Sequence, residues 1–344
     1  MKNNLNGKNK INYEEPKCKK LLSVLTKNSY CQAYNNSFSV FKSIDNILYL
    51  IYTNKKNAII YFNLEKQQKV CEIKNNNSIT GFKHYLDKIN KRDLLITIFS
   101  PKNDIKLWSI KNMECILHLQ KIYKEGYLYS ACFINHNNNI YIISSNCNFE
   151  GSSEGLYVFD LKGNKINEIK STNEPTYLID IFFDKKNCKN YIITTHYKYI
   201  KSYDYGNNEL YYRYDDGERN FGHFNADIYK YDEELIKIIE SCWNGIIRIW
   251  DFHSGQLLNK IELLYDQVKE ICLWNKDYLI LDCDDIGVKL LDLNNGKITN
   301  ILFDHNKWVL NNKKVLHPKY GECLLSQGFG KNKIKMWIIK KQNH

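Results

Sequence analysis

The sequence lacks the features that mark several classes of protein. Only 4 of its 344 residues are Pro, against 26 Tyr and 15 Phe. No apolar run approaches the roughly 18 residues of a membrane helix, and residues 1–16 lack the apolar core of a signal peptide. The 11 Cys include no CxxC pair, which argues against a zinc framework. We therefore expect an intracellular chain, cytoplasmic or nuclear and not secreted, with reduced cysteines and a disordered polar arm at 1–16.

Catalytic signatures are missing as well. There is no HExxH zinc motif and no GxSxG nucleophile elbow. The stretch "GFGKNK" at Gly328 lacks the Gly-Lys-Ser/Thr spacing of a phosphate loop, and an apolar strand pattern follows it instead of a helix. The acids of "DCDD", Asp282–Asp285, suggest a cation site, but we favour the interpretation of turn acids. We predict no enzyme activity, and no catalytic, cofactor-binding or metal-binding residues.

The formal net charge of +11 is the clearest compositional bias. Attraction to nucleic acid or to an anionic membrane depends on clustered charge more than on the sum. The lysines are scattered in ones and twos, as at Lys55-Lys56 and Lys340-Lys341. We therefore favour compositional bias as the explanation and keep nucleic-acid binding as a second choice.

A short pattern, apolar–x–apolar–aromatic–Asp, recurs along the chain. Its clearest copy is "IRIWD" at Ile247–Asp251, and degraded copies are "IIYFN", "IKLWS", "LYVFD", "IKSYD", "VKLLD" and "IKMWI". Seven copies near one period indicate an internal repeat. The aromatic position, 41 to 51 residues apart from copy to copy, is occupied by Phe62, Trp108, Phe159, Tyr203, Trp250, Leu291 and Trp337.

Each repeat contains up to four short apolar runs and no room for a long helix. One run precedes the pattern, as in "RDLLITIFS", and another follows a polar turn, as in "DFHSGQLLNKI". Gly and Asn in these turns supply the positive φ angles of tight hairpins. Four strands every 40–45 residues or so are typical of a propeller blade. The sequence thus predicts an all-β fold, a single seven-bladed β-propeller with four antiparallel strands in each blade.

The repeat resembles that of the WD-repeat β-propeller family. The match is best in blade five, where Gly222-His223 precedes Trp250-Asp251 at the spacing of GH…WD repeats. The resemblance implies a buried tetrad, which here maps onto His223, Trp250, Asn244 and either Ser241 or Glu240. It also implies structural anchors at Phe62, Trp108, Phe159, Tyr203, His223, Trp250, Asp251, Asp292 and Trp337.

The last repeat has no outermost strand, because only "IIKKQNH" follows Trp337. A spare apolar run lies at 17–26, before blade one begins. We predict that this run completes blade seven and closes the ring, which would otherwise expose a strand edge. The predicted domains are the arm at 1–16, the propeller at 17–339 and a short basic tail at 340–344.

The resemblance also implies where a partner binds. Loops that join strand b to strand c, and strand d to the next strand a, share the usual partner-binding face of this family. Several carry aromatic residues or Arg, which are enriched in interface hot spots. The predicted partner-binding residues are Tyr127, Phe149, Tyr197, Arg219, Trp243, Trp308 and Phe329.

The favoured function is a non-catalytic scaffold, a monomeric propeller within a larger complex that presents one loop face to a protein or peptide. The alternative is association with RNA or a ribonucleoprotein, suggested by the net charge. Phosphoinositide binding ranks lower, because the basic FRRG-type motif is absent. The sequence does not identify the partner.

Overall fold

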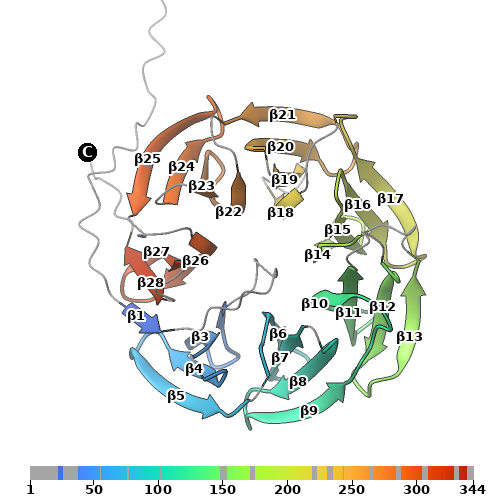
Figure 1. Cartoon of the computed structure of the whole chain (residues 1–344), viewed down its shortest axis with the longest axis vertical. Coiled ribbons are helices and arrows are strands. Elements are labelled where there is room, and N and C mark those ends of the chain that lie inside the picture. Colours follow the sequence, from blue (N-terminus) through green and yellow to red (C-terminus); the bar gives the residue numbers. More distant parts are fainter. Residues whose placement is uncertain are drawn as a thin grey trace, which may run out of the picture.

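The computed structural model describes residues 22–25, 38–54, 56–75, 77–100, 102–147, 153–170, 175–218, 223–230, 235–242, 244–263, 267–283, 288–303, 309–328 and 333–338. Every regular element in these ranges is a β-strand. The strands form seven four-stranded antiparallel sheets, arranged as blades around a ring (Figure 1). The predicted fold class is therefore confirmed. A search of the same ranges for helices that could span a bilayer gives none.

Six blades are built from four consecutive strands, which follow one another from the inside of the ring outward. Blade one is β2 (Phe38–Lys42), β3 (Leu48–Thr53), β4 (Ile59–Asn63) and β5 (Gln68–Ile73). Blade two is β6 (Gly81–Asp87), β7 (Arg92–Phe99), β8 (Asp104–Ser109) and β9 (Glu114–Leu119). Blade three is β10 (Tyr127–His136), β11 (Asn139–Cys147), β12 (Leu156–Asp160) and β13 (Lys165–Ile169). Blade four is β14 (Leu178–Asp184), β15 (Lys189–Thr195), β16 (Ile200–Asp204) and β17 (Glu209–Tyr214).

Blade five is β18 (His223–Lys230), β19 (Ile236–Cys242), β20 (Ile246–Asp251) and β21 (Leu257–Glu262). Blade six is β22 (Val268–Asn275), β23 (Tyr278–Cys283), β24 (Val288–Asp292) and β25 (Lys297–Phe303). Blade seven combines β26 (Val309–His317), β27 (Gly321–Gly328) and β28 (Lys333–Ile338) with β1 (Leu22–Leu25) from the other end of the chain.

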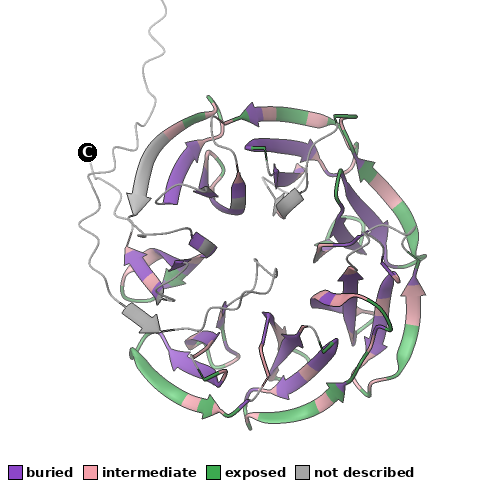
Figure 2. Ribbon diagram, viewed as in Figure 1, coloured by how far each residue is buried: buried purple, intermediate pink, exposed green. Residues whose placement is uncertain are grey.

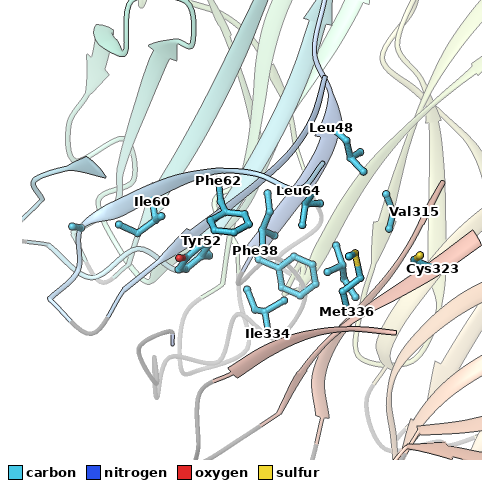
Figure 3. Packing of buried hydrophobic residues seen from close by; sticks show 13 residues of the cluster. Phe38, Leu48, Tyr52, Ile60, Phe62, Leu64, Val315, Cys323, Ile334 and Met336 are labelled. Carbon is cyan, nitrogen blue, oxygen red and sulfur yellow. The ribbon is translucent and has the colours of Figure 1, made fainter. Parts of the chain in front are cut away.

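The ring closes as the sequence predicts. Strand β1 pairs antiparallel with β28, with Leu22 opposite Met336 and Leu25 opposite Lys333. Next to this junction, buried side chains of blades one and seven form one core cluster, in which Phe38 and Phe62 pack with Ile334 and Met336 (Figure 3). Closure therefore joins the two ends of the ring through backbone pairing and a shared apolar core.

Burial decreases outward across the first five blades. Where burial is described, their inner three strands are mostly buried, whereas the outermost strands β5, β9, β13, β17 and β21 are mostly exposed or half-buried (Figure 2). Aliphatic side chains are about half exposed on these outer strands, as at Val70 (50%) and Leu210 (52%). The blades thus bury their faces against one another, and the rim remains in solvent.

The turn after Trp250-Asp251 explains the glycine in the best repeat. The Asp251 carboxylate accepts hydrogen bonds from the Ser254 backbone N–H and hydroxyl, both at 2.7 Å. Gly255 then adopts a φ of +66°, and a Cβ there would lie 1.6 Å from the Tyr212 ring of blade four. Backbone conformation and close approach both require glycine at this position.

The aromatic repeat positions are buried. The exposed fractions are 8% for Phe62, 7% for Trp108, 6% for Phe159, 7% for Tyr203, 2% for Trp250 and 7% for Trp337. Their energetic role as anchors stays a prediction. At the strand end, Asp292 resembles Asp251 in capping its turn, because Asp292 accepts a hydrogen bond from the Asn294 backbone N–H at 2.8 Å.

The tetrad suggested by the repeat is replaced in blade five. Trp108 and Trp337 donate their indole N–H to Thr97 and Ser326 at 2.9 and 2.7 Å. The strand register puts Glu240 at the corresponding position of blade five, opposite Arg248. Among the described residues no acceptor lies within hydrogen-bond distance of Trp250 Nε1. The side chain of His223 lies outside the described part.

Candidate interaction surface

The b–c and d–a loops of blades two and three meet on one face of the ring, which we call the loop face. Asn103, in the β7–β8 turn, accepts a hydrogen bond from Leu128 N (2.6 Å) and donates one to Gly126 O (2.9 Å). Tyr123, in the β9–β10 loop, shares a hydrogen bond with the Ser144 hydroxyl at 2.9 Å. These contacts fix the β9–β10 loop against the β7–β8 turn of blade two and strand β11 of blade three.

Two of the seven predicted partner-binding residues are described, and both lie on the loop face. Tyr127 begins β10, and Tyr197 lies in the β15–β16 loop with 43% of its surface exposed. The other five lie outside the described residues: Phe149, Arg219, Trp243, Trp308 and Phe329. The role of all seven in binding stays a prediction.

Tyr127 and Tyr197 are linked by two further tyrosines that the sequence alone did not single out. Tyr127 is opposite Cys147 in the β10–β11 ladder, and the Cys147 thiol shares a hydrogen bond with Tyr177. The ring of Tyr177 meets that of Tyr129 edge-on, at a centroid distance of 5.5 Å. The tyrosine patch, Tyr127, Tyr129, Tyr177 and Tyr197, therefore spans blades three and four with all four side chains at least partly accessible.

Burial keeps the phenol of Tyr177, within the patch, protonated at neutral pH. Burial raises the pKa of Tyr177 to about 12, and the neighbouring Cys147 and Tyr197 contribute to the rise. Burial likewise raises the pKa of the Cys147 thiol. A neutral phenol offers an O–H donor at the end of an apolar ring, the combination that favours tyrosine in protein interfaces.

Two cationic side chains lie over the ring of Tyr199, two residues after Tyr197. The Arg213 guanidinium lies 3.9 Å from the centroid of the Tyr199 ring, and Lys201 lies 5.1 Å from it. Arg213 also donates to Asp215 at 2.6 Å. These contacts hold the β15–β16 loop, which carries Tyr197, against the outer strand β17.

Blade five carries a buried ion network just behind its loops. Arg248 is only 2% exposed, and its guanidinium donates to Asp216 at 2.6 Å. It also lies 3.5 Å from Glu240 and 3.1 Å from the Cys242 sulfur. Such a network fixes strand geometry, because each buried charge depends on its partners.

The innermost strands of blades five, six and seven carry a second cluster of charged side chains, formed by Asp227, Glu270 and Lys313. Lys313 Nζ lies 3.6 Å from Glu270 Oε1, whose side chain is almost completely buried. Burial raises the pKa of Asp227 to about 6, while Lys313 lowers it and Asp180 raises it. Burial also raises the pKa of Glu270 well above its usual value.

The acids of "DCDD" do not form a described ligand set. Asp282 is buried in β23 and accepts a hydrogen bond from the Asn312 side chain, and Asp284 and Asp285 lie outside the described residues. Within the described ranges no three His, Cys, Asp or Glu side chains are grouped so that they could hold a metal ion.

No protein-family model matches the chain. A curated relative, the U3 small nucleolar RNA-associated protein 21 homolog of Schizosaccharomyces pombe, is 26% identical over 69 residues. The match covers 20% of this chain and 8% of the relative, so less than a tenth of that protein is represented. Together, the internal repeat, the seven blades and this match fit a WD-repeat propeller.

Proposed function

We propose that the protein is a non-catalytic scaffold that binds a protein or peptide through its loop face. The observation that carries this proposal is the tyrosine patch, four partly accessible tyrosines gathered on one sector of a closed ring. Rigid aromatic side chains supply large contact area at low cost in conformational entropy, which is why tyrosine is common in binding surfaces. The other residues proposed to take part in binding lie outside the described residues: Phe149, Arg219, Trp243, Trp308 and Phe329.

The proposed setting is intracellular, with the propeller as one monomeric subunit of a larger complex. Eight cysteines of the described residues are free thiols, among them the exposed Cys115 and Cys188. Free thiols suit a reducing compartment.

Affinity purification with mass spectrometry tests the proposal. We expect Tyr127→Ala combined with Tyr197→Ala to lose a protein captured by the wild type, without a change in melting temperature. Phe183→Ala is the matched control, because Phe183 is 49% exposed on β14 and does not belong to the patch. If the tyrosine variant instead unfolds at lower temperature, the tyrosines cap their blades, and the proposal loses its support.

Association with RNA is the second candidate. It is supported by the net charge of +11 and by the name of the relative, an RNA-associated protein. Binding to oligouridine that weakens steeply as salt rises would favour it. Absence of binding at low salt would remove it.

A further inference from the structure

A hollow opens on the loop face beside the tyrosine patch, between the β7–β8 turn and the β9–β10 loop. Its volume is about 790 Å³. We name it the lysine hollow, and its lining includes Lys102, Asp104, Gln120, Lys121, Tyr123 and Lys124. The three lysines are exposed, and Tyr123 is only 3% exposed.

The hollow presents an excess of positive charge. Its one lining carboxylate, Asp104, is already engaged, because it accepts a hydrogen bond from Lys121 N at 3.0 Å and lies 3.2 Å from His118 Nε2. Lys102 donates to the neutral Asn77 side chain. Among the described residues, Lys121 and Lys124 have no carboxylate at ion-pair distance. Two unpaired ammonium groups therefore face solvent together.

The backbone that carries these lysines is held in place before any ligand binds. Lys121 adopts a φ of +48°, a left-handed conformation that a residue with a side chain seldom takes. The adjacent Ile122 N–H donates to Asn103 O at 3.0 Å. Asn103 itself has a φ of +57°. Preorganisation of this kind lowers the entropic cost of binding.

We propose that the lysine hollow binds the carboxylates of an acidic peptide segment, and that this segment belongs to the partner bound by the tyrosine patch. The inference rests in this respect on the proposed function. A single loop connects the two surfaces, since Lys121 and Lys124 precede Tyr127 in the β9–β10 connection. A peptide that crosses from one surface to the other would place its acids over the hollow and its apolar residues over the tyrosines.

The same surface is less suited to an RNA strand. Buried Tyr123 offers no exposed ring on which a base could stack inside the hollow. Between the hollow and Tyr127 lie Glu125, which is exposed, and Glu154, which accepts a hydrogen bond from Glu125 N at 2.9 Å. A continuous phosphate backbone would have to pass these carboxylates, whereas a peptide carries charge only where its acids are.

Fluorescence anisotropy with a labelled peptide of alternating Glu and Gly tests the proposal. We expect the wild type to bind this peptide and not its Gln counterpart, and to bind it more weakly at high salt. Lys121→Glu with Lys124→Glu should weaken binding at least about tenfold. The matched control is Lys185→Glu with Lys186→Glu, which makes the same change in net charge. These two lysines lie in the β14–β15 turn, at the end of β15 opposite to the loop that carries Tyr197. The control should retain nearly full affinity.

Three outcomes would overturn the inference: no binding of the Glu peptide, equal loss in the two charge-reversed variants, or tighter binding of oligouridine through the same lysines. Equal loss would mean that overall charge, and not the hollow, attracts the peptide. The Tyr127→Ala, Tyr197→Ala variant separates this proposal from the proposed function. It should still bind the Glu peptide, so failure of the tyrosine patch and failure of the hollow give different results.

Discussion

The indole N–H of Trp108 donates a hydrogen bond of 2.9 Å to the hydroxyl of Thr97 on the neighbouring strand of blade two. Thr97 is fully buried, so the two groups satisfy each other away from water. The same relationship joins Trp337 to Ser326 in blade seven at 2.7 Å. In each of these two blades, a hydrogen-bonded pair of side chains thus joins the second strand to the third.

Thr97→Val should destabilise the fold by about 1–3 kcal/mol, because it keeps the side-chain shape but leaves the Trp108 N–H without an acceptor. Denaturant unfolding measures the change. A double-mutant cycle with Trp108→Phe isolates the hydrogen bond, and the double variant should be less destabilised than the sum of the two single variants. Additive effects would show that the pair does not interact energetically.

Two arginines with equally short ion pairs should differ greatly in their effect on stability. Arg248 donates to Asp216 at 2.6 Å with a side chain 2% exposed, while Arg213 donates to Asp215 at 2.6 Å with a side chain 49% exposed. Arg248→Met should lower the free energy of unfolding by about 3–5 kcal/mol, because it removes the positive charge beside the buried Glu240. Arg213→Met should cost at most about 1 kcal/mol. Adding Glu240→Gln should recover part of the loss in the Arg248 variant, and a lack of recovery would contradict the network.

The number of blades and the closure of the ring could be predicted from the sequence, because both follow from counting strands in a pattern that repeats at a regular spacing. Apolar runs, turn glycines such as Gly255 and a missing outer strand are visible without coordinates. The tetrad could not be predicted in detail, because register decides whether Glu240 or Ser241 occupies the hydroxyl position. The structure selects Glu240, opposite Arg248. In blade five, Glu240 with Arg248 thus occupies the place where blade two has the Thr97 hydroxyl that accepts the hydrogen bond of Trp108.

The tyrosine patch was predicted only in part for a related reason. Tyr127 and Tyr197 lie at loops, where an aromatic side chain stands out in the sequence. Tyr129 lies within a strand and Tyr177 directly before one, and there an aromatic is expected from strand propensity alone. The available signal was the pair of tyrosines in "YLYS", but a β-bulge between Leu128 and Ser130 interrupts the strand alternation at Tyr129. Their meeting with Tyr177 depends on contacts between blades.

Asp227→Asn should change how stability depends on pH. Burial raises the pKa of Asp227 from 3.8 to about 6 in the folded chain, so ionisation there opposes folding. The unfavourable contribution of ionised Asp227 to folding is absent below the pKa that this side chain has in the unfolded chain. It grows as pH rises from about 4 to about 6 and reaches its full size above pH 6 or so. Relative to wild type, the Asn variant should therefore gain stability across this window, as measured by thermal melts at a series of pH values.

Asp160→Asn provides a control of opposite sign. Hydrogen bonding from Asn164, the largest cause, lowers the pKa of Asp160, although partial burial opposes this. Ionised Asp160 stabilises the folded chain at pH values above the pKa that Asp160 has in the unfolded chain. This stabilisation is lost as pH falls through the lower pKa that Asp160 has in the folded chain. The Asp160 variant should thus approach wild-type stability at low pH. Parallel curves for the Asp227 variant and wild type would contradict the role given to burial.

Deletion of the N-terminal strand should disrupt the ring as a whole. A chain that begins at residue 31 lacks β1, so β28 loses the partner that pairs with Lys333–Met336. The exposed edge and the weakened core between blades one and seven should lower the melting temperature by more than about 5 °C and promote aggregation. Removal of residues 1–12 leaves β1 in place and should change little. A synthetic peptide of residues 17–30, added to the shortened chain, should restore part of the lost thermal stability, because β1 binds through backbone pairing with β28. A soluble chain beginning at residue 31 with wild-type thermal stability would show that the ring does not depend on this strand.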